Sequence, residues 1–121
     1  MRLASVLTPP TPEHLKLAAQ CGVTDFVARY PLEGPTQLAT VKREVNSFGL
    51  ELSVLEGYVP MESIIVGQDD GTEMAAMKQL IRTMGELDIP ILCYNFIAAS
   101  DWARTTLDAP ERGGAKVNRL H

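Results

Sequence analysis

The chain has 121 residues, of which 45% are hydrophobic and 21% charged, and its formal net charge at pH 7 is −4. This length fits one compact domain, and the composition excludes an intrinsically disordered chain. No apolar run reaches the roughly 18 residues of a membrane helix, and Arg and Lys are scattered among acids. We therefore expect a cytoplasmic protein without a membrane or nucleic-acid partner.

The first third of the chain reads as strand, helix and strand. The segment RLASVL predicts a strand over about 2–7. Thr11 as N-cap and Pro12 at the first helical position predict a helix over about 12–21, because proline loses no hydrogen bond there. Gly22 can end this helix, and the second strand is predicted over about 23–30.

The middle of the chain shows the same alternation of helices and strands. Apolar residues at helical spacing predict helices over about 35–48 and 72–87, the second with a stripe of Met74, Met77, Ile81 and Met84 expected in the core. Between them, Leu50, Leu52 and Val54 alternate with Glu51 and Ser53, which predicts a strand over about 50–56.

The last third begins with IPILCYNF, a nearly continuous apolar run. It predicts a strand over about 89–96 that is buried on both faces of a parallel sheet. Residues 107–121 are polar and Gly-rich, so we expect a tail or loop there rather than a fifth strand. Cys21 and Cys93 belong to no metal or redox motif and are expected to be buried thiols.

The order βαβαβαβ predicts an α/β fold with a parallel sheet and helices outside it. The turn after the first strand contains no glycine, so no phosphate-binding loop is present. The remaining common solution is a (β/α)₈ (TIM) barrel, which needs roughly 250 residues. Residues 1–121 are therefore expected to form a single partial barrel domain, about half of a barrel.

Active sites of such barrels lie at the carboxyl ends of the strands. The polar and aromatic residues that follow the predicted strands are Arg29, Tyr30, Glu56, Tyr94, Asn95, Asp101, Trp102 and Arg104.

Five of these residues are our candidates for binding substrate. Arg104 can grip a carboxylate through two hydrogen bonds, Trp102 can form an apolar wall, and Asn95 can donate to and accept from sugar hydroxyls. Glu56 and Tyr94 are further candidates. A structural interpretation remains open for each: Glu56 as a solvated carboxylate, Asn95 as a turn residue, and 101–105 as a capped turn that packs on the sheet. His14 is expected at the surface and His121 at a frayed terminus, and two isolated histidines cannot build a metal site.

The second half of the chain resembles the N-terminal half of the mannonate dehydratase family. The resemblance is carried by GLELSVLEG (49–57), Pro60 and Glu62, and by ILCYNFIAASDWARTTL (91–107), in which CYNF followed by DWxRT is the most specific part. The turn after the first strand lacks the aromatic sequence associated with the family.

The resemblance implies a barrel like that of xylose isomerase, a divalent metal such as Mn²⁺, and the dehydration of D-mannonate to 2-keto-3-deoxy-D-gluconate in hexuronate (glucuronate) catabolism. The ligands that bind the metal in the family come from later strands and have no counterpart in this chain. The resemblance also implies that this chain is truncated and inactive alone.

Two alternatives stay open: a sugar isomerase or epimerase of the same barrel type, and a non-catalytic α/β binding or assembly module. The first and fourth strands of a half barrel would both be edges with unpaired backbone groups. We therefore expect self-association through these edges.

Overall fold

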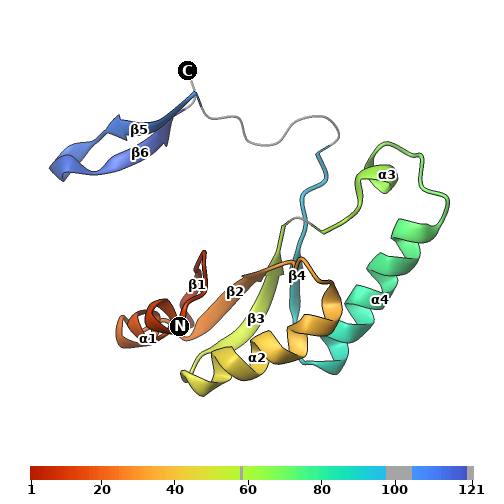
Figure 1. The fold of residues 1–121 in the computed structure, drawn as a ribbon, viewed down its shortest axis with the longest axis horizontal. Coiled ribbons are helices and arrows are strands. Elements are labelled where there is room, and N and C mark those ends of the chain that lie inside the picture. The colour runs from red at the N-terminus through yellow and green to blue at the C-terminus, as the bar shows by residue number, and fades with distance from the viewer. Residues whose placement is uncertain (58, 98–104, 120–121) are drawn as a thin grey trace.

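A computed structural model describes residues 1–57, 59–97 and 105–119 of the chain. Strands and helices alternate through most of it (Figure 1). The elements are β1 (Ala4–Val6), α1 (Pro12–Gln20), β2 (Asp25–Arg29), the 3₁₀ helix η1 (Pro35–Gln37), α2 (Leu38–Ser47), β3 (Glu51–Glu56), α3 (Glu62–Ile65), α4 (Thr72–Glu86), β4 (Ile91–Cys93), β5 (Thr106–Pro110), the 3₁₀ helix η2 (Arg112–Gly114) and β6 (Lys116–Arg119).

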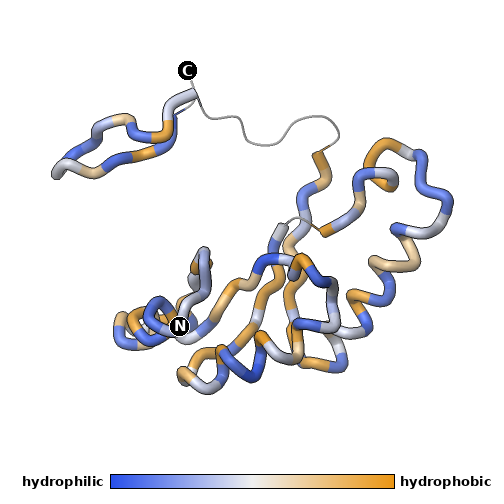
Figure 2. The backbone as a smooth tube through the Cα atoms, in the orientation of Figure 1, coloured by the Kyte–Doolittle hydropathy of each residue, from blue (hydrophilic) through white to orange (hydrophobic). Residues whose placement is uncertain are grey.

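The main body is a four-stranded sheet in the order β1-β2-β3-β4, and every neighbouring pair of strands is parallel. The predicted α/β class and parallel βαβαβαβ order are therefore confirmed. One hydrophobic core joins the strands to α1, α2 and α4, with Phe26 and Leu52 among its fully buried side chains. Figure 2 shows the corresponding concentration of hydrophobic residues along β2, β3 and β4.

The predicted helix boundaries have clear physical causes. The Thr11 hydroxyl accepts a hydrogen bond from the His14 N–H at 3.2 Å, and Pro12 occupies the first turn of α1. Gly22 and Gly49 adopt φ values of 83° and 77° just after α1 and α2, where side chains other than glycine are strained. Pro35 starts a 3₁₀ turn, so α2 itself begins later than predicted.

A β-bulge in β3 changes which of its residues face the core. Phe26 pairs with Leu52 but Val27 pairs with Val54, so Ser53 is an extra residue between two pairs. The bulge shifts the alternation, and Leu55 rather than Val54 is fully buried in the core. Ser53, predicted to alternate with the apolar residues, is buried as well.

The stripe of apolar residues predicted for α4 is only partly in the core. Met84 is buried and Met77 packs against the core, but Met74 and Ile81 are exposed. Leu80, which the predicted stripe did not include, is fully buried instead. The buried face is therefore rotated slightly from the predicted one.

The expectation that the fourth strand is buried on both faces is wrong. It forms only over β4, where Ile91 is 51% exposed. Among the described residues β4 pairs with β3 alone and forms an edge of the sheet. Cys93 is exposed for this reason, and Cys21 is exposed at the end of α1, so both cysteines depart from the expected burial.

The C-terminal segment is not the loop that its composition predicted. β5 and β6 form an antiparallel hairpin in which Ala109 pairs with Val117 and Pro110 with Lys116. Its connection carries Gly113 and Gly114, both with positive φ. Figure 1 places this hairpin away from the four-stranded sheet. The glycines thus mark the turn of a hairpin, a common use of glycine in such connections.

Candidate binding edge of the parallel sheet

The face of the sheet opposite the helices is here called the inner face. Its side chains lie in levels, and each level consists of residues that pair with one another across neighbouring strands. Strand side chains alternate between two faces, and the core residues define the helix side. One level, from β1 to β4, is apolar: Val6 pairs with Val27, Val27 with Val54, and Val54 with Ile91.

Polar residues lie on both sides of this apolar level. Asp25 and Ser53 lie toward the amino ends of the strands, and Arg29, Glu56 and Cys93 toward the carboxyl ends, where Arg29 pairs with Glu56 and Glu56 with Cys93.

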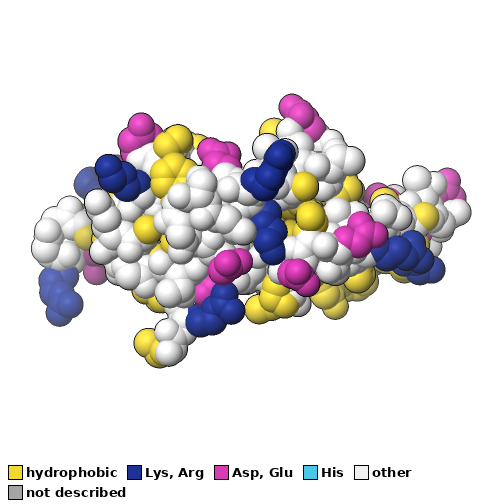
Figure 3. Space-filling view, turned by 90° about the horizontal axis from the view of Figure 1, so that it is seen from below, with side chains coloured by type: hydrophobic (Ala, Val, Ile, Leu, Met, Phe, Trp, Pro, Cys, Tyr) yellow, Lys and Arg dark blue, Asp and Glu magenta, His cyan; other side chains and the backbone are white. Residues whose placement is uncertain are grey.

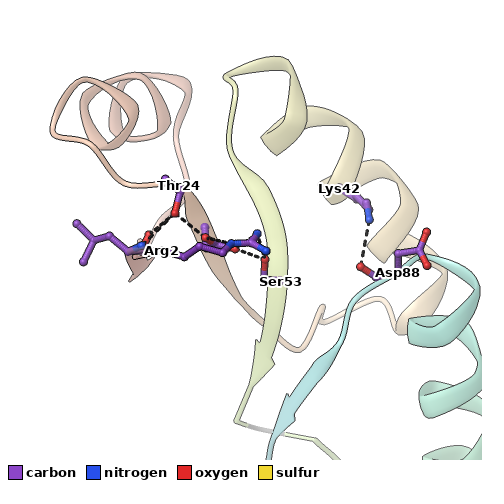
Figure 4. Close-up of polar contacts among 7 residues, drawn as sticks. Arg2, Thr24, Lys42, Ser53 and Asp88 are labelled. Atoms are coloured by element: carbon purple, nitrogen blue, oxygen red, sulfur yellow. Dashed lines mark hydrogen bonds and ion pairs between the residues drawn. The ribbon is translucent and has the colours of Figure 1, made fainter.

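The polar group at the amino end is built around Asp25, which is 3% exposed. Its carboxylate accepts hydrogen bonds from Arg2 (Nε, 2.8 Å), from the Thr24 hydroxyl (2.6 Å) and from the Ser53 hydroxyl. Arg2 also forms an ion pair with it and donates to the Ser53 hydroxyl at 3.2 Å, so the guanidinium crosses from the segment before β1 to β3 (Figure 4). The hydrogen bond from Arg2 is the main reason that the pKa of Asp25 falls to about 2.

This Asp25 group has a structural role. It lies at the amino ends of the strands, the end that supports stability rather than chemistry in parallel barrels. Its donors leave the carboxylate well satisfied, which suits a buried charge. Sequence reasoning missed it because Arg2, Asp25 and Ser53 lie on three separate segments and match no motif.

The carboxyl end of the inner face carries an ion pair between neighbouring strands. Arg29 Nη1 lies 3.3 Å from Glu56 Oε1, and the two side chains are 41% and 34% exposed. Gly57 follows Glu56 with φ 64°, and its N–H donates to the Cys93 carbonyl at 3.0 Å. A Cβ atom on Gly57 would lie 3.2 Å from Arg29 Nη1. The bare backbone at this position therefore leaves room for the guanidinium.

Three of the predicted substrate-binding residues are described by the structure. Glu56 ends β3, while Tyr94, which is 55% exposed, and Asn95, also exposed, follow β4. All three therefore lie at the carboxyl ends of neighbouring parallel strands, at the same edge. Trp102 and Arg104 lie outside the described residues, so their role stays a prediction.

Two further candidates near this edge have different surroundings. Tyr30 directly follows Arg29 but is partly buried against the core. Asp101, the predicted start of a short helix, lies outside the described residues.

The described residues do not fit a metal site. Among residues 1–57, 59–97 and 105–119, no three His, Cys, Asp or Glu side chains gather to hold an ion. His14 is exposed, as expected, and its Nδ1 lies 2.8 Å from the Pro9 carbonyl oxygen, whereas His121 lies outside the described residues. We therefore assign no metal-dependent step of a reaction to the described residues. In the same described part, no helix has the length and apolarity that a bilayer crossing requires.

A parallel α/β sheet in the order β1-β2-β3-β4, with polar side chains at the carboxyl ends of its strands, is consistent with part of a barrel of the TIM type. Comparison with solved structures supports this class. The crystal structure of mannonate dehydratase from Streptococcus suis serotype 2 matches 98% of this chain and 36% of its own, with a TM-score of 0.79 and 27% sequence identity.

The family is shown by sequence. The model of the D-mannonate dehydratase (UxuA) family matches residues 14–121, and the chain belongs to this family. A mannonate dehydratase of Streptococcus equi subsp. zooepidemicus is 37% identical over 87 residues, which cover 71% of this chain and 23% of that protein. Mannonate dehydratase 2 of Agrobacterium fabrum is 34% identical over 105 residues, covering 82% and 26% respectively. The chain thus spans about a quarter of the length of these relatives.

Proposed function

We propose that this chain forms part of the substrate-binding wall of a mannonate dehydratase, a carbon–oxygen lyase that converts D-mannonate to 2-keto-3-deoxy-D-gluconate and water. Membership of the family is the observation that carries this proposal. The structure supports it by bringing Glu56, Tyr94 and Asn95 to the carboxyl ends of adjacent parallel strands. The proposal extends to a place in hexuronate catabolism in the cytoplasm.

The reaction sets requirements for such a wall. A base removes the proton from the carbon next to the carboxylate, the hydroxyl on the following carbon departs as water, and the resulting enol becomes a ketone. Negative charge builds up around the carboxylate during proton removal, so a nearby fixed donor or cation lowers the barrier. Asn95 is suited to bind hydroxyl groups because its amide both donates and accepts. We assign neither the base nor a ligand of Mn²⁺ to a described residue, and metal dependence remains a proposal for the whole enzyme.

A sugar isomerase or epimerase of the same barrel type would present similar polar groups. The relatives of this chain named above are mannonate dehydratases, which favours the lyase.

The test is a chimera in which residues 1–121 replace the matching 36% of the Streptococcus suis enzyme. With Mn²⁺ supplied, we expect it to dehydrate D-mannonate faster than the same enzyme with that segment deleted. In the chimera, Asn95→Ala should lower kcat/KM by about tenfold, the effect of losing roughly one hydrogen bond of about 1.4 kcal/mol. Asn118→Ala, at an exposed position of β6, serves as the control.

Two results would count against the proposal. The first is a chimera that folds and binds the metal but turns over a ketose or an epimerisable sugar instead of D-mannonate. The second is equal activity of the Asn95→Ala and Asn118→Ala variants with that of the unaltered chimera, because it would remove Asn95 from the substrate-binding wall.

A further inference from the structure

We propose that Arg29 binds the carboxylate group of the sugar acid and that Glu56, on the neighbouring strand, holds the Arg29 guanidinium in position. This inference rests on the proposed function, because it names the group that recognises the acid end of the substrate. Our sequence-based choice for that task, Arg104, lies outside the described residues. Among the described residues, Arg29 is an arginine at the carboxyl edge of the inner face.

Arg29 lies at the carboxyl end of a central strand. It is the last residue of β2, and its partner across the sheet, Glu56, is the last residue of β3. Both side chains therefore lie at the carboxyl ends of central strands, where barrels of this type bind substrates. The Arg29 side chain is 41% exposed, so a small anion in solution can reach it.

The Arg29 guanidinium has a charged partner on the neighbouring strand. Glu56 contacts it through Nη1 at 3.3 Å, and an arginine carries five N–H donors in a planar fork. An ion pair on one arm restricts the rotation of the whole plane, which reduces the entropy lost when an anion binds. Gly57 completes the arrangement, because any side chain there would come within 3.2 Å of Nη1.

The carboxyl edge also carries exposed amide and phenol groups. Tyr94 and Asn95 follow β4, whose Cys93 pairs with Glu56, so hydroxyl-binding groups follow the strand next to the ion pair. A cation on one strand and amide and phenol groups after another match a ligand with a carboxylate at one end and hydroxyls along its length. This combination fits an acid that also carries hydroxyl groups, such as the sugar acid of the proposed function.

The test uses the 121-residue chain itself, labelled with ¹⁵N, and follows the Nε–Hε signal of Arg29 by NMR. D-mannonate and D-mannitol are compared at equal millimolar concentrations, because mannitol keeps the chain of hydroxyls and lacks the carboxylate. We expect D-mannonate to shift the Arg29 signal in a saturable manner and D-mannitol to leave it unchanged. Arg29→Gln should weaken D-mannonate binding at least tenfold, whereas Arg82→Gln, at an exposed site on α4, should not change it.

Variants of Glu56 separate positioning from simple charge. Glu56→Gln removes a negative charge but keeps an oxygen that accepts from Arg29, so D-mannonate should bind a few-fold more tightly. Glu56→Ala removes the same charge and the acceptor together, so it should bind more weakly than Glu56→Gln. A merely structural ion pair would lower the melting temperature in both variants without this difference in affinity.

Several outcomes would overturn the inference. If D-mannonate binds without moving the Arg29 signal, Arg29 does not bind the carboxylate. The same conclusion follows if the Arg29→Gln variant binds D-mannonate as tightly as the unaltered chain. Both results leave the proposed function intact. Equal shifts with mannitol exclude carboxylate recognition, and equal affinities of Glu56→Gln and Glu56→Ala exclude positioning by Glu56. A chain that shows no response to D-mannonate also overturns the inference, while turnover by the chimera tests the proposed function separately.

Discussion

Asp25 shows how one buried carboxylate connects three segments that are distant in the sequence. Its partners Arg2 and Ser53 lie 23 and 28 residues away, before β1 and in the bulge of β3. Ser53 lies on the inner face, opposite the buried Leu52, and its hydroxyl donates to the carboxylate there. The amino ends of the first three strands are therefore held together by one charged, hydrogen-bonded group.

We expect Asp25→Asn to destabilise the fold by about 1.5–3 kcal/mol at pH 7, the usual worth of a hydrogen bond to a charged group. Asn keeps the shape of the side chain, but it cannot form the ion pair with Arg2. Urea unfolding measures this change. Asp108→Asn is the matched control, since Asp108 is exposed in β5 and lies 3.8 Å from Lys116, so its loss should cost less than about 0.5 kcal/mol. Equal costs for the two variants would contradict the structural role of Asp25.

The pH dependence of stability should come partly from the same group. The pKa of Asp25 is lowered from 3.8 to about 2, chiefly by the hydrogen bond from Arg2. A carboxyl group whose pKa is lower in the folded chain stabilises it above about pH 4 and loses this contribution as the pH falls towards about 2. The unaltered chain should therefore lose more stability between pH 4 and pH 2 than the Asp25→Asn variant. Parallel losses in both chains would show that other groups dominate.

At the scale of elements, local signals predicted the helices and strands of the first 90 residues better than the end of the chain. Thr11 with Pro12 and the glycines after α1 and α2 act within a few residues, so the sequence reveals them. The bulge at Ser53 and the hairpin of β5 and β6 depend on pairing between strands, which composition does not encode. At the candidate site, the predicted order of parallel strands was enough to place Glu56 and Asn95 at the carboxyl edge, and their role in binding stays a prediction. The pairing of Arg29 with Glu56 needed the register of β2 against β3.

Contact between α2 and α4 gives a prediction at this scale. Lys42 Nζ, on α2, donates to the Leu87 carbonyl at the end of α4 and, at 3.3 Å, to the Asp88 carbonyl (Figure 4). The positive charge complements the C-terminal end of the helix dipole. Lys42→Met should lower the free energy of unfolding by about 1 kcal/mol. Lys78→Met, at an exposed position of α4, should change it little, and urea denaturation of the pair of variants would decide the matter.

For the whole molecule, the open inner face is the dominant feature. β1 and β4 each pair with one strand among the described residues, and Val6 and Ile91 of the apolar level are exposed on them. Figure 3 shows hydrophobic side chains reaching the surface between charged ones, most densely along the lower margin of the view. Exposed parallel edges with an apolar face favour pairing with further strands.

We expect the isolated 121-residue chain to self-associate through these edges. Light scattering across a dilution series should show a mass above that of the 13.2 kDa monomer, falling on dilution. Val6→Lys and Ile91→Lys, which place charges on the two edge strands, should shift the chain towards the monomer, whereas Leu17→Lys on the exposed side of α1 should not. A monomer at all concentrations with cooperative unfolding would contradict this expectation.

The central claim is that the carboxyl edge of the four-stranded sheet, and not its amino edge, meets the sugar acid. A backbone NMR titration of the chain with D-mannonate tests it most directly, because both edges are reported in one experiment. We predict that the amide signals of Glu56, Tyr94 and Asn95 shift in a saturable manner while those of Asp25 and Ser53 stay in place. Shifts confined to Asp25 and Ser53, or spread equally over both edges, would contradict the claim.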